Sequence, residues 1–366
     1  MVIALIAEGD GLGGTERLIV QLAQSLRSRG HSVVVIGPAA LTGKGWLGGE
    51  IRSLGFTYVT IPRRHMLDPR SVTDILRLLR QHRVDVAHSH EFAPSVFGSA
   101  ACWLSSRTHI ITMHSNLYFA GARRRTVAFR WAARHSRAVV AVSRDTRDDA
   151  ERLLGLPVGS VHVIPNGIAS RLGARDPVRV ELGVSNDEPL VVAIGNVSPR
   201  KSHMLILRAL VQLQAEGRAP RWRLAIAGAN AGSWDELLGA AAAAGVGDRL
   251  HLLGPRSDTE NLLAAADVFA MSSIHEGMPL AIMEAMFARK PIISTVAGGI
   301  GEMITDGQEG LLVPIGDVEA MAAGLGRLLA DAALRARLGT AAAVRARRQF
   351  GIDAMVDAYE RLYTSA

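Results

Sequence analysis

Short apolar runs alternate with longer amphipathic segments along the first half of the chain. Short, β-branched-rich runs predict buried strands, whereas apolar positions three and four residues apart predict helices. Helical patterns occupy residues 16–29 and 71–81. The predicted strands are residues 2–7, 32–36, 58–61, 84–88, 109–113, 138–142 and 161–164. This rhythm predicts a parallel, doubly wound α/β sheet.

The pattern breaks at Pro165, Asn166 and Gly167 and then starts again. New strand signals follow at residues 190–194, 223–227, 250–253, 266–271 and 291–294. They predict a second Rossmann-like domain. Residues 352–363 form a last helical pattern that can pack back on the first domain. The predicted domains are therefore 1–170 with the C-terminal helix 351–366, and 171–350.

The composition limits the class of protein. Of 366 residues, 48% are hydrophobic, yet no apolar run approaches the roughly 20 residues that a membrane-spanning helix needs. The first residues break into a glycine loop, which predicts a first strand and not a signal peptide. A single cysteine, Cys102, excludes a disulfide framework and a multi-cysteine metal site. These features favour a cytoplasmic protein.

The net charge of +7 is unevenly distributed. Residues 1–170 carry 21 Lys and Arg against 12 Asp and Glu, which gives +9, and the remainder carries 20 against 22, which gives −2. Basic clusters lie at Arg63 and Arg64 and in residues 123–137, where arginines alternate with apolar side chains. Such a helix favours peripheral contact with an anionic membrane, and a solvated arginine-rich face is the alternative. No signature of nucleic-acid binding accompanies the charge.

The most informative segment is residues 272–284, which places Glu276 and Glu284 across a loop-to-helix junction. Pro279 stands where a first helical turn tolerates proline. The free N–H groups at the start of this helix, in residues 277–280, favour a diphosphate. One carboxylate could hold a ribose diol and the other a sugar hydroxyl, and a sugar nucleotide offers all three groups.

Three further groups of residues point to the same kind of ligand. Arg200 and Lys201 follow a buried strand and can neutralise a diphosphate leaving group. The glycines of the first strand–helix turn, which include Gly13 and Gly14, permit close backbone approach to a phosphate or sugar, although they do not match GxGxxG. Three histidines end neighbouring strands, and their spacing leaves zinc open; they are His88, His90 and His114. The chain has no DxD motif, so no divalent metal or other cofactor is expected.

Together these segments resemble a family 4 retaining glycosyltransferase of the GT-B fold. Glu276 and Glu284 match the EX7E motif, and supporting matches are GGTE at 13–16, DVAHSH at 85–90, PNGI at 165–168 and SPRKSH at 198–203. The resemblance implies two Rossmann-like domains that face a cleft, with the donor bound mostly by the second and the acceptor by the first. Ser202 departs from the usual glycine, and AGAN near Asn230 departs from a frequent Gly-Asp-Gly turn.

The resemblance also implies roles for individual residues. Arg200 and Lys201 would bind the diphosphate, Glu284 the ribose, and Glu276 the donor sugar. His114 would approach that sugar from the first domain. The remaining positions implied or inferred to bind substrate are Gly13, Gly14, His88, Ser143, Asn166, Gly277, Met278, Pro279 and Leu280.

The predicted reaction is metal-independent transfer of a sugar from a nucleotide diphosphate, with UDP favoured and GDP next. The acceptor hydroxyl would belong to a saccharide, a lipid-linked glycan or a small molecule. Retention by same-face attack and by a covalent Glu276 intermediate both remain open. The alternatives are a sugar-nucleotide 2-epimerase or hydrolase on the same fold and a non-catalytic carbohydrate-binding relative, whereas a dehydrogenase lacks its glycine fingerprint.

Overall fold

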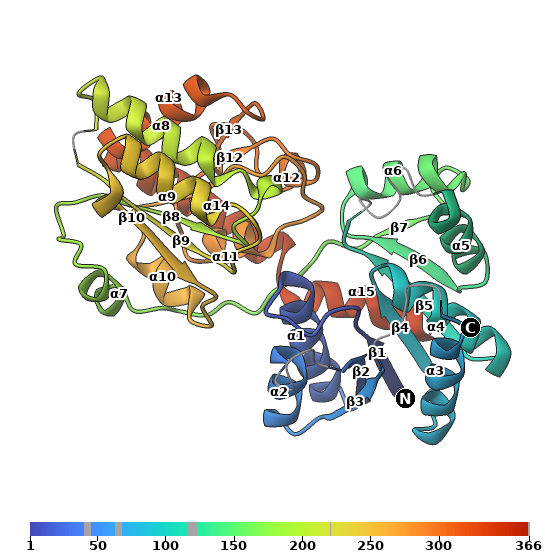
Figure 1. Cartoon of the computed structure of the whole chain (residues 1–366). Coiled ribbons are helices and arrows are strands. Elements are labelled where there is room, and N and C mark those ends of the chain that lie inside the picture. The colour runs from blue at the N-terminus through green and yellow to red at the C-terminus, as the bar shows by residue number, and fades with distance from the viewer. Residues whose placement is uncertain (40–44, 63–67, 116–122, 220, 365–366) are drawn as a thin grey trace. The chain divides into compact units, whose positions relative to one another are not determined.

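A computed structural model of the chain describes residues 1–39, 45–62, 68–115, 123–219 and 221–364. Two compact units make up the molecule (Figure 1). Unit 1 contains Met1–Ala169 and Gly351–Ala366, and unit 2 contains Ser170–Phe350. The division lies one residue from the predicted boundary. Arg63 and Arg64, one of the two predicted basic clusters, lie outside the described residues.

Unit 1 is an alternation of strands and helices that the final helix of the chain completes. Its strands are β1 (Val2–Ile6), β2 (Ser32–Pro38), β3 (Thr57–Ile61), β4 (Val86–His90), β5 (Thr108–Met113), β6 (Ala138–Ala141) and β7 (His162–Val163). Its helices are α1 (Gly14–Ser28), α2 (Trp46–Ser53), α3 (Arg70–Gln81), α4 (Phe92–Ser105), α5 (Arg123–Arg134), α6 (Arg144–Leu154) and α15 (Ile352–Thr364).

The seven strands of unit 1 form one parallel sheet in the order β3-β2-β1-β4-β5-β6-β7. Because strands buried on both faces read as continuous apolar runs, the run in β1 extends from Ile3 to Ile6 with no exposed side chain. Side chains of β5 and β6 join those of α4 and α5 in one core cluster, where Phe92 and Phe129 stack on each other.

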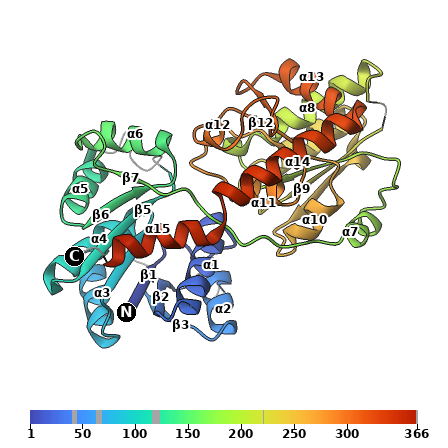
Figure 2. The ribbon, with the colours of Figure 1, turned by 180° about the vertical axis from the view of Figure 1, so that it is seen from behind.

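Helix α15 returns to unit 1 and crosses the sheet beside β1, β4 and β5 (Figure 2). Arg29, which follows α1, forms ion pairs with Asp353, Asp357 and Glu360 on one side of this helix. An adjacent side carries buried Tyr359 and Tyr363, which bond to Thr112 of β5 and His88 of β4. The structure therefore agrees with the predicted packing of the last helix on the first domain.

Unit 2 has the same alternating architecture. Its strands are β8 (Leu190–Ile194), β9 (Arg223–Ala227), β10 (Leu250–Gly254), β11 (Val268–Met271), β12 (Ile292–Thr295) and β13 (Leu311–Val313). Its helices are α7 (Asp176–Glu181), α8 (His203–Ala215), α9 (Trp234–Ala243), α10 (Thr259–Ala265), α11 (Leu280–Phe287), α12 (Ile300–Met303), α13 (Val318–Ala330) and α14 (Ala332–Gln349), with the short 3₁₀ turns η2 (Pro199–Lys201) and η3 (Gly247–Arg249).

The sheet of unit 2 is also parallel, in the order β10-β9-β8-β11-β12-β13. Its core joins β8, β9 and β12 to α8 and α13, and the buried indole of Trp222 fills one end of it. Two Rossmann-like domains with parallel sheets confirm the predicted fold class. No helix within the described ranges is long and apolar enough to cross a membrane.

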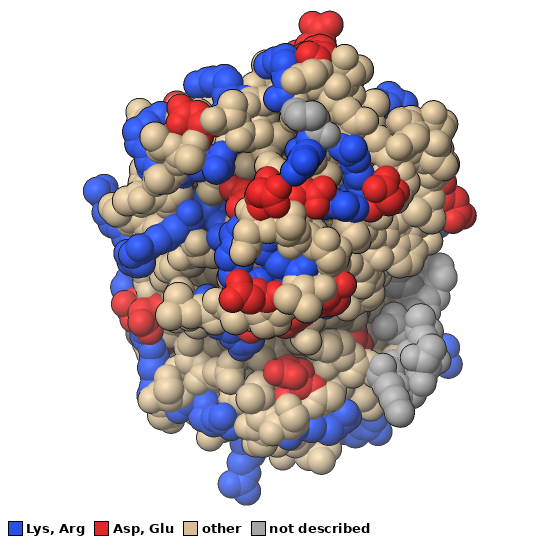
Figure 3. Space-filling model, turned by 90° about the vertical axis from the view of Figure 1, so that its left-hand side faces the viewer, with Lys and Arg blue, Asp and Glu red and all other residues tan. Residues whose placement is uncertain are grey.

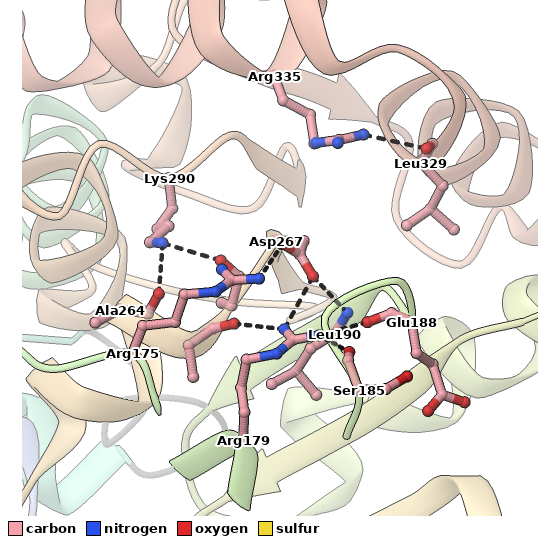
Figure 4. A network of polar contacts seen from close by, with 12 residues as sticks. Arg175, Arg179, Ser185, Glu188, Leu190, Ala264, Asp267, Lys290, Leu329 and Arg335 are labelled. Carbon is pink, nitrogen blue, oxygen red and sulfur yellow. Dashed lines mark hydrogen bonds and ion pairs between the residues drawn. The ribbon is translucent and has the colours of Figure 1, made fainter. Parts of the chain in front are cut away.

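A polar network holds the amino-terminal ends of β8 and β11 (Figure 4). Asp267, directly before β11, accepts hydrogen bonds from Arg175, from Arg179 and from the backbone N–H of Leu190. Lys290 donates to the carbonyls of residues 264 and 266 at the end of α10, and burial lowers its pKa to about 8. Since ligands of open α/β sheets bind at the carboxyl ends of strands, this network belongs to the scaffold.

Charged side chains of both signs lie on the surface among uncharged ones. On the face shown in Figure 3, Lys and Arg lie among Asp and Glu. In unit 1, by contrast, α5 carries arginines and no acidic side chain, and Arg123, Arg124 and Arg134 are exposed there.

Candidate active site

The carboxyl ends of β8 and β11 form the topological switch point of unit 2. These two strands are neighbours in the sheet, and the chain winds away from them in opposite directions. Such a point opens a crevice in which α/β proteins bind ligands. The loops that follow β8 and β11 carry Arg200, Lys201 and Glu276, so the structure brings together three residues predicted from segments 75 residues apart.

Lys201 is held in place along its whole length. It ends the turn η2, and its carbonyl accepts a hydrogen bond of 2.9 Å from the hydroxyl of Ser272. Its aliphatic stem lies over Gly195, where an added methyl group would approach Cε of Lys201 to 3.2 Å. Gly195 also has a φ of 151°, which side chains rarely tolerate. The β8 loop thus requires glycine beneath the lysine.

Lys201 and Glu276 form a buried ion pair. Nζ of Lys201 lies 2.5 Å from Oε1 of Glu276, and the two side chains are 14% and 8% exposed. Arg200 adds a longer contact of 3.9 Å to the same carboxylate and donates to the carbonyl of His275 at 3.2 Å. Because its side chain is 44% exposed, Arg200 leaves part of its guanidinium open to a ligand.

The loop from Gly277 to Leu280 is buried and leads into α11, for which Pro279 is the N-cap. The first N–H groups of a helix have no partner within the helix, and they favour negative charge. The carbonyl of Glu276 accepts from the N–H of Gly299, so this loop also contacts the loop after β12. Glu284 lies about one turn into α11 and is half-buried.

The segment that departs from the Gly-Asp-Gly turn pairs with the β8 loop. Val197 and the segment 229–231 exchange two backbone hydrogen bonds of 2.8 Å, and Val197 forms a bridge with Asn230. Gly228 lies directly on Gly195, since an added methyl group would approach the carbonyl oxygen of Gly195 to 2.0 Å. The site is therefore supported on this side by backbone packed on backbone.

Unit 1 has its own switch point, between β1 and β4. The predicted glycine loop follows β1, but its space is already occupied. Added methyl groups at Gly9 and Gly13 would lie 2.1 and 2.3 Å from the carboxylate oxygens of Glu16. In this structure these glycines make room for the side chain of Glu16, which the sequence did not predict. Gly14 is the first residue of α1.

Two more carboxylates lie in the loop that follows β1. Glu8 accepts a hydrogen bond of 3.1 Å from the N–H of Ala93 in α4, and Asp10 accepts one of 2.8 Å from Gly48 in α2. Burial raises the pKa of Glu8 and of Glu16. Thr15 donates to Glu91 at 3.3 Å and so joins the start of α1 to the residue that follows β4. This edge of unit 1 is acidic, whereas that of unit 2 is cationic.

His114 follows β5, is half-buried, and lies 3.1 Å from His90 between ring nitrogens. Burial lowers its pKa to about 4, so its ring is neutral near pH 7. β4 extends to His90 and so places His88 inside the strand, and the contact of His88 with substrate stays a prediction. There the His88 ring is fully buried, and its two nitrogens bond to Tyr363 and Thr112 at 2.7 Å.

The two remaining predicted positions are buried. Ser143 is the N-cap of α6 and accepts a hydrogen bond of 3.1 Å from the N–H of Thr146. Asn166 is 4% exposed and follows β7. Contact of Ser143 or Asn166 with substrate stays a prediction. No group of three or more His, Cys, Asp or Glu side chains could hold a metal ion in the part of the chain that the structure describes.

Two family models match consecutive parts of the sequence. Residues 12–171 match Glycosyltransferase Family 4, and residues 174–345 match Glycosyl transferases group 1. The lipopolysaccharide core biosynthesis glycosyltransferase LpsE of Rhizobium meliloti is 28% identical over 96% of both chains. The D-inositol 3-phosphate glycosyltransferase of Xylanimonas cellulosilytica is 34% identical over 61% of this chain and 57% of that relative's length.

A solved structure shares the whole fold. The HepE protein of Anabaena, crystallised in complex with UDP-glucose, superposes with a TM-score of 0.88 over 100% of both chains at 22% identity. With the two family models on successive halves and both parallel sheets in place, the chain belongs to the GT-B glycosyltransferases that combine a Family 4 domain with a group 1 domain.

Proposed function

We propose that this protein transfers a sugar, with retention of anomeric configuration, from a nucleotide diphosphate sugar to a hydroxyl acceptor. The observation that carries the proposal is the cluster of Arg200, Lys201 and Glu276 at the switch point of unit 2. Two cations and the start of a helix converge there, which suits a departing diphosphate. We find no feature in the described residues that favours a 2-epimerase or a hydrolase over a transferase.

In this proposal Lys201 keeps two partners. An ammonium group has three N–H donors, so Nζ can bond to Glu276 and still donate to a phosphate oxygen. Arg200 would bind the diphosphate through the exposed part of its guanidinium. The N–H groups of Gly277, Met278 and Leu280 would bind sugar hydroxyls and phosphate, and Glu284 would bind the ribose.

The ion pair favours same-face attack over a covalent intermediate. A carboxylate that bonds to a lysine at 2.5 Å has its negative charge compensated and is a weaker nucleophile. Glu276 would then orient the donor sugar near its 3-hydroxyl. The leaving phosphate, stabilised by both cations, would accept the proton of the acceptor hydroxyl as the new glycosidic bond forms.

A UDP-sugar is the donor we favour, and a GDP-sugar is the next choice. The HepE structure contains UDP-glucose, and a relative from Escherichia coli, 24% identical over 88% of this chain, is named for transfer from UDP-Gal to a diphosphoundecaprenol-linked sugar. The acceptor would be a saccharide, a lipid-linked glycan or a small molecule bound by unit 1. Arg200 and Lys201 would supply the positive charge that a metal provides in other transferases, so we propose metal-independent transfer.

Incubation with a panel of UDP- and GDP-sugars, with and without acceptors, tests the proposal. Transfer predicts that nucleotide release rises with a suitable acceptor and that the product keeps the donor's anomeric configuration by NMR. Release or isomerisation of the sugar at a rate independent of every acceptor would instead identify a hydrolase or 2-epimerase. A protein that binds these donors and turns over none would be the non-catalytic relative.

The acceptor side includes a surface suited to an anionic membrane. Trp103 and Leu104 on α4 are 59% and 54% exposed, and Val127 and Trp131 on α5 are 59% and 37% exposed. The two indoles contact edge to face, with ring centroids 6.3 Å apart. Helix α5 also carries exposed Arg123, Arg124 and Arg134. Exposed Trp beside Arg is typical of side chains at a membrane interface, so we propose peripheral binding at the cytoplasmic face of the membrane.

Sedimentation with vesicles tests this surface. Replacing Arg123 and Arg124 by Gln should weaken binding to phosphatidylglycerol-containing vesicles about 30-fold, given about 1 kcal/mol per arginine. The matched control replaces Arg347 and Arg348, an exposed pair at the end of α14, and should leave binding unchanged. Equal binding of both double variants would exclude the proposed surface.

A further inference from the structure

The ring of His90 lies beneath His114 and has one partner for two nitrogens. Nδ1 of His90 lies 3.1 Å from Nε2 of His114, and the ring centroids are 5.4 Å apart. The other nitrogen, Nε2, is buried without a hydrogen-bond partner among the residues that the structure describes. The His90 side chain is 0% exposed, so solvent does not reach that nitrogen.

This arrangement decides which nitrogen of His90 carries the proton. A buried N–H without an acceptor is rarer in proteins than a buried acceptor without a donor. A proton on Nε2 would be stranded, whereas a proton on Nδ1 points at His114. Burial lowers the pKa of His90 well below its ordinary value, so the ring carries only one proton near neutral pH. Nδ1–H is therefore the donor, and Nε2 of His114 accepts.

The same bond fixes the protonation of His114. A neutral imidazole has one N–H, and since Nε2 of His114 accepts, its proton resides on Nδ1. The ring remains neutral because burial lowers its pKa to about 4. His114 thus presents a neutral N–H donor at the carboxyl end of β5.

The neighbouring residues restrain His90 without competing for its proton. His88 packs on the His90 ring at 4.2 Å between centroids, but its own nitrogens bond to Tyr363 and Thr112. Thr112 bonds in addition to Tyr359 of α15. His88, Thr112 and the two tyrosines of α15 therefore bond to one another and not to His90. The His88 ring, fixed in this way, packs on the His90 ring and restrains it.

We propose that His90 is a positioning residue that sets His114 in its Nδ1–H form, so that His114 donates to an oxygen of the sugar nucleotide. This inference rests on the proposed function for the identity of that oxygen. The tautomer itself depends only on the packing within unit 1. A ring held in one orientation and one tautomer needs no rearrangement when the donor binds.

Nitrogen-15 NMR of histidine-labelled protein tests the tautomer directly. Two-bond couplings between ring protons and nitrogens distinguish the two neutral forms, and His114→Gln assigns the signal. We expect the Nδ1–H form for His114 in the wild type across pH 6–8. A wild-type His114 in the Nε2–H form would overturn the proposal, whatever the activity of the protein.

A pair of variants tests the effect on turnover. In His90→Asn the amide N–H₂ takes the place of Nδ1, whereas in His90→Gln the amide reaches beyond it. We expect His90→Gln to lower kcat about 10- to 100-fold with little change in the donor KM, and His90→Asn to restore most of it. Equal loss in both variants, with unchanged melting temperatures, would contradict positioning through this bond. If no sugar nucleotide reacts, the proposed function fails, while the NMR result still decides the tautomer.

Discussion

The two units share one topology but place opposite chemistry at equivalent points of it. At the switch point of unit 2, Arg200 and Lys201 face Glu276. At that of unit 1, Glu8 follows β1 and Glu16 lies in the first turn of α1; both are half-buried, and burial raises the pKa of both carboxyls. A doubly wound sheet therefore fixes where a ligand binds, and the side chains of its loops decide which ligand.

The different side chains at the two switch points suit different substrates. The cations and helix start of unit 2 suit a diphosphate, which unit 1 would repel with its carboxylates. Carboxylates suit hydroxyl groups, which can donate hydrogen bonds to them. We therefore propose that unit 2 binds the donor and that unit 1 binds the acceptor.

The largest predicted effect is the loss of turnover in Lys201→Met. Removing this cation takes away stabilisation of the leaving diphosphate, for which about 10²- to 10³-fold in kcat is typical of one such donor. Steady-state rates measure it. Arg208→Gln, an exposed cation of α8, is the control and should keep wild-type rates. Wild-type turnover in Lys201→Met would remove the lysine from the mechanism.

The next largest effect is that acidification should lower the free energy of unfolding of unit 1 more than that of unit 2. Burial lowers the pKa of four histidines in unit 1, namely His88, His90, His109 and His114, and of two in unit 2, namely His203 and His251. Below pH 6.5 the unfolded chain binds protons that the folded one does not, so the free energy of unfolding falls as the pH falls towards 4. Each such histidine contributes up to about 1.4 kcal/mol per pH unit.

Glu8 and Glu16 act in the opposite direction, because their raised pKa values let the folded state keep protons that the unfolded state loses. The net expectation is that unit 1 loses about 2–3 kcal/mol more than unit 2 between pH 7.5 and 5.5. Hydrogen exchange followed by mass spectrometry resolves the opening of each unit. Equal losses in both units would contradict the role given to the buried histidines.

Two glycines sharpen the comparison further. Gly228→Ala would press a methyl group on the backbone of Gly195, whereas Gly13→Ala would meet the flexible carboxylate of Glu16. We expect Gly228→Ala to cost about 2 kcal/mol in unfolding free energy and Gly13→Ala less than about 1 kcal/mol. Thermal denaturation of both variants measures the difference. A larger loss in Gly13→Ala would mean that Glu16 cannot move.

The smallest predicted effect concerns metal. Because Arg200 and Lys201 already provide two positive charges, we expect turnover to stay within about twofold of the untreated rate after removal of divalent ions with EDTA. Added Mg²⁺ or Mn²⁺ should not raise it. A rate that falls with EDTA and returns with Mg²⁺ would show that the cations of unit 2 do not suffice.

Apolar runs predicted most of the fold, because strands buried on both faces leave a direct mark in the sequence. Residues 190–194 and 223–227 are strands with the predicted bounds. The sequence missed β13, which has only three residues, and ended β4 too early. The apolar pattern of β4 is interrupted by buried His88, Ser89 and His90. The hydrogen bond that Tyr363 makes with His88 comes from α15, far along the chain, so local sequence does not reveal it.

The candidate site was predicted as a set of residues, but their mutual contacts were not. Strand ends place Lys201 and Glu276 at one sheet edge, yet only the structure shows that they bond to each other. Glycine spacing likewise gave no indication that Glu16 occupies the loop of Gly9 and Gly13. Contacts between side chains depend on loop conformation, which local patterns do not encode.

The most direct test of the central claim is the affinity of UDP for the intact protein, measured by isothermal titration calorimetry without metal. We predict binding to the wild type and to Arg208→Gln, and a loss of at least about tenfold in Lys201→Met, because one charge-assisted bond to phosphate is removed. The same affinity in all three proteins would contradict a diphosphate site at the carboxyl ends of β8 and β11.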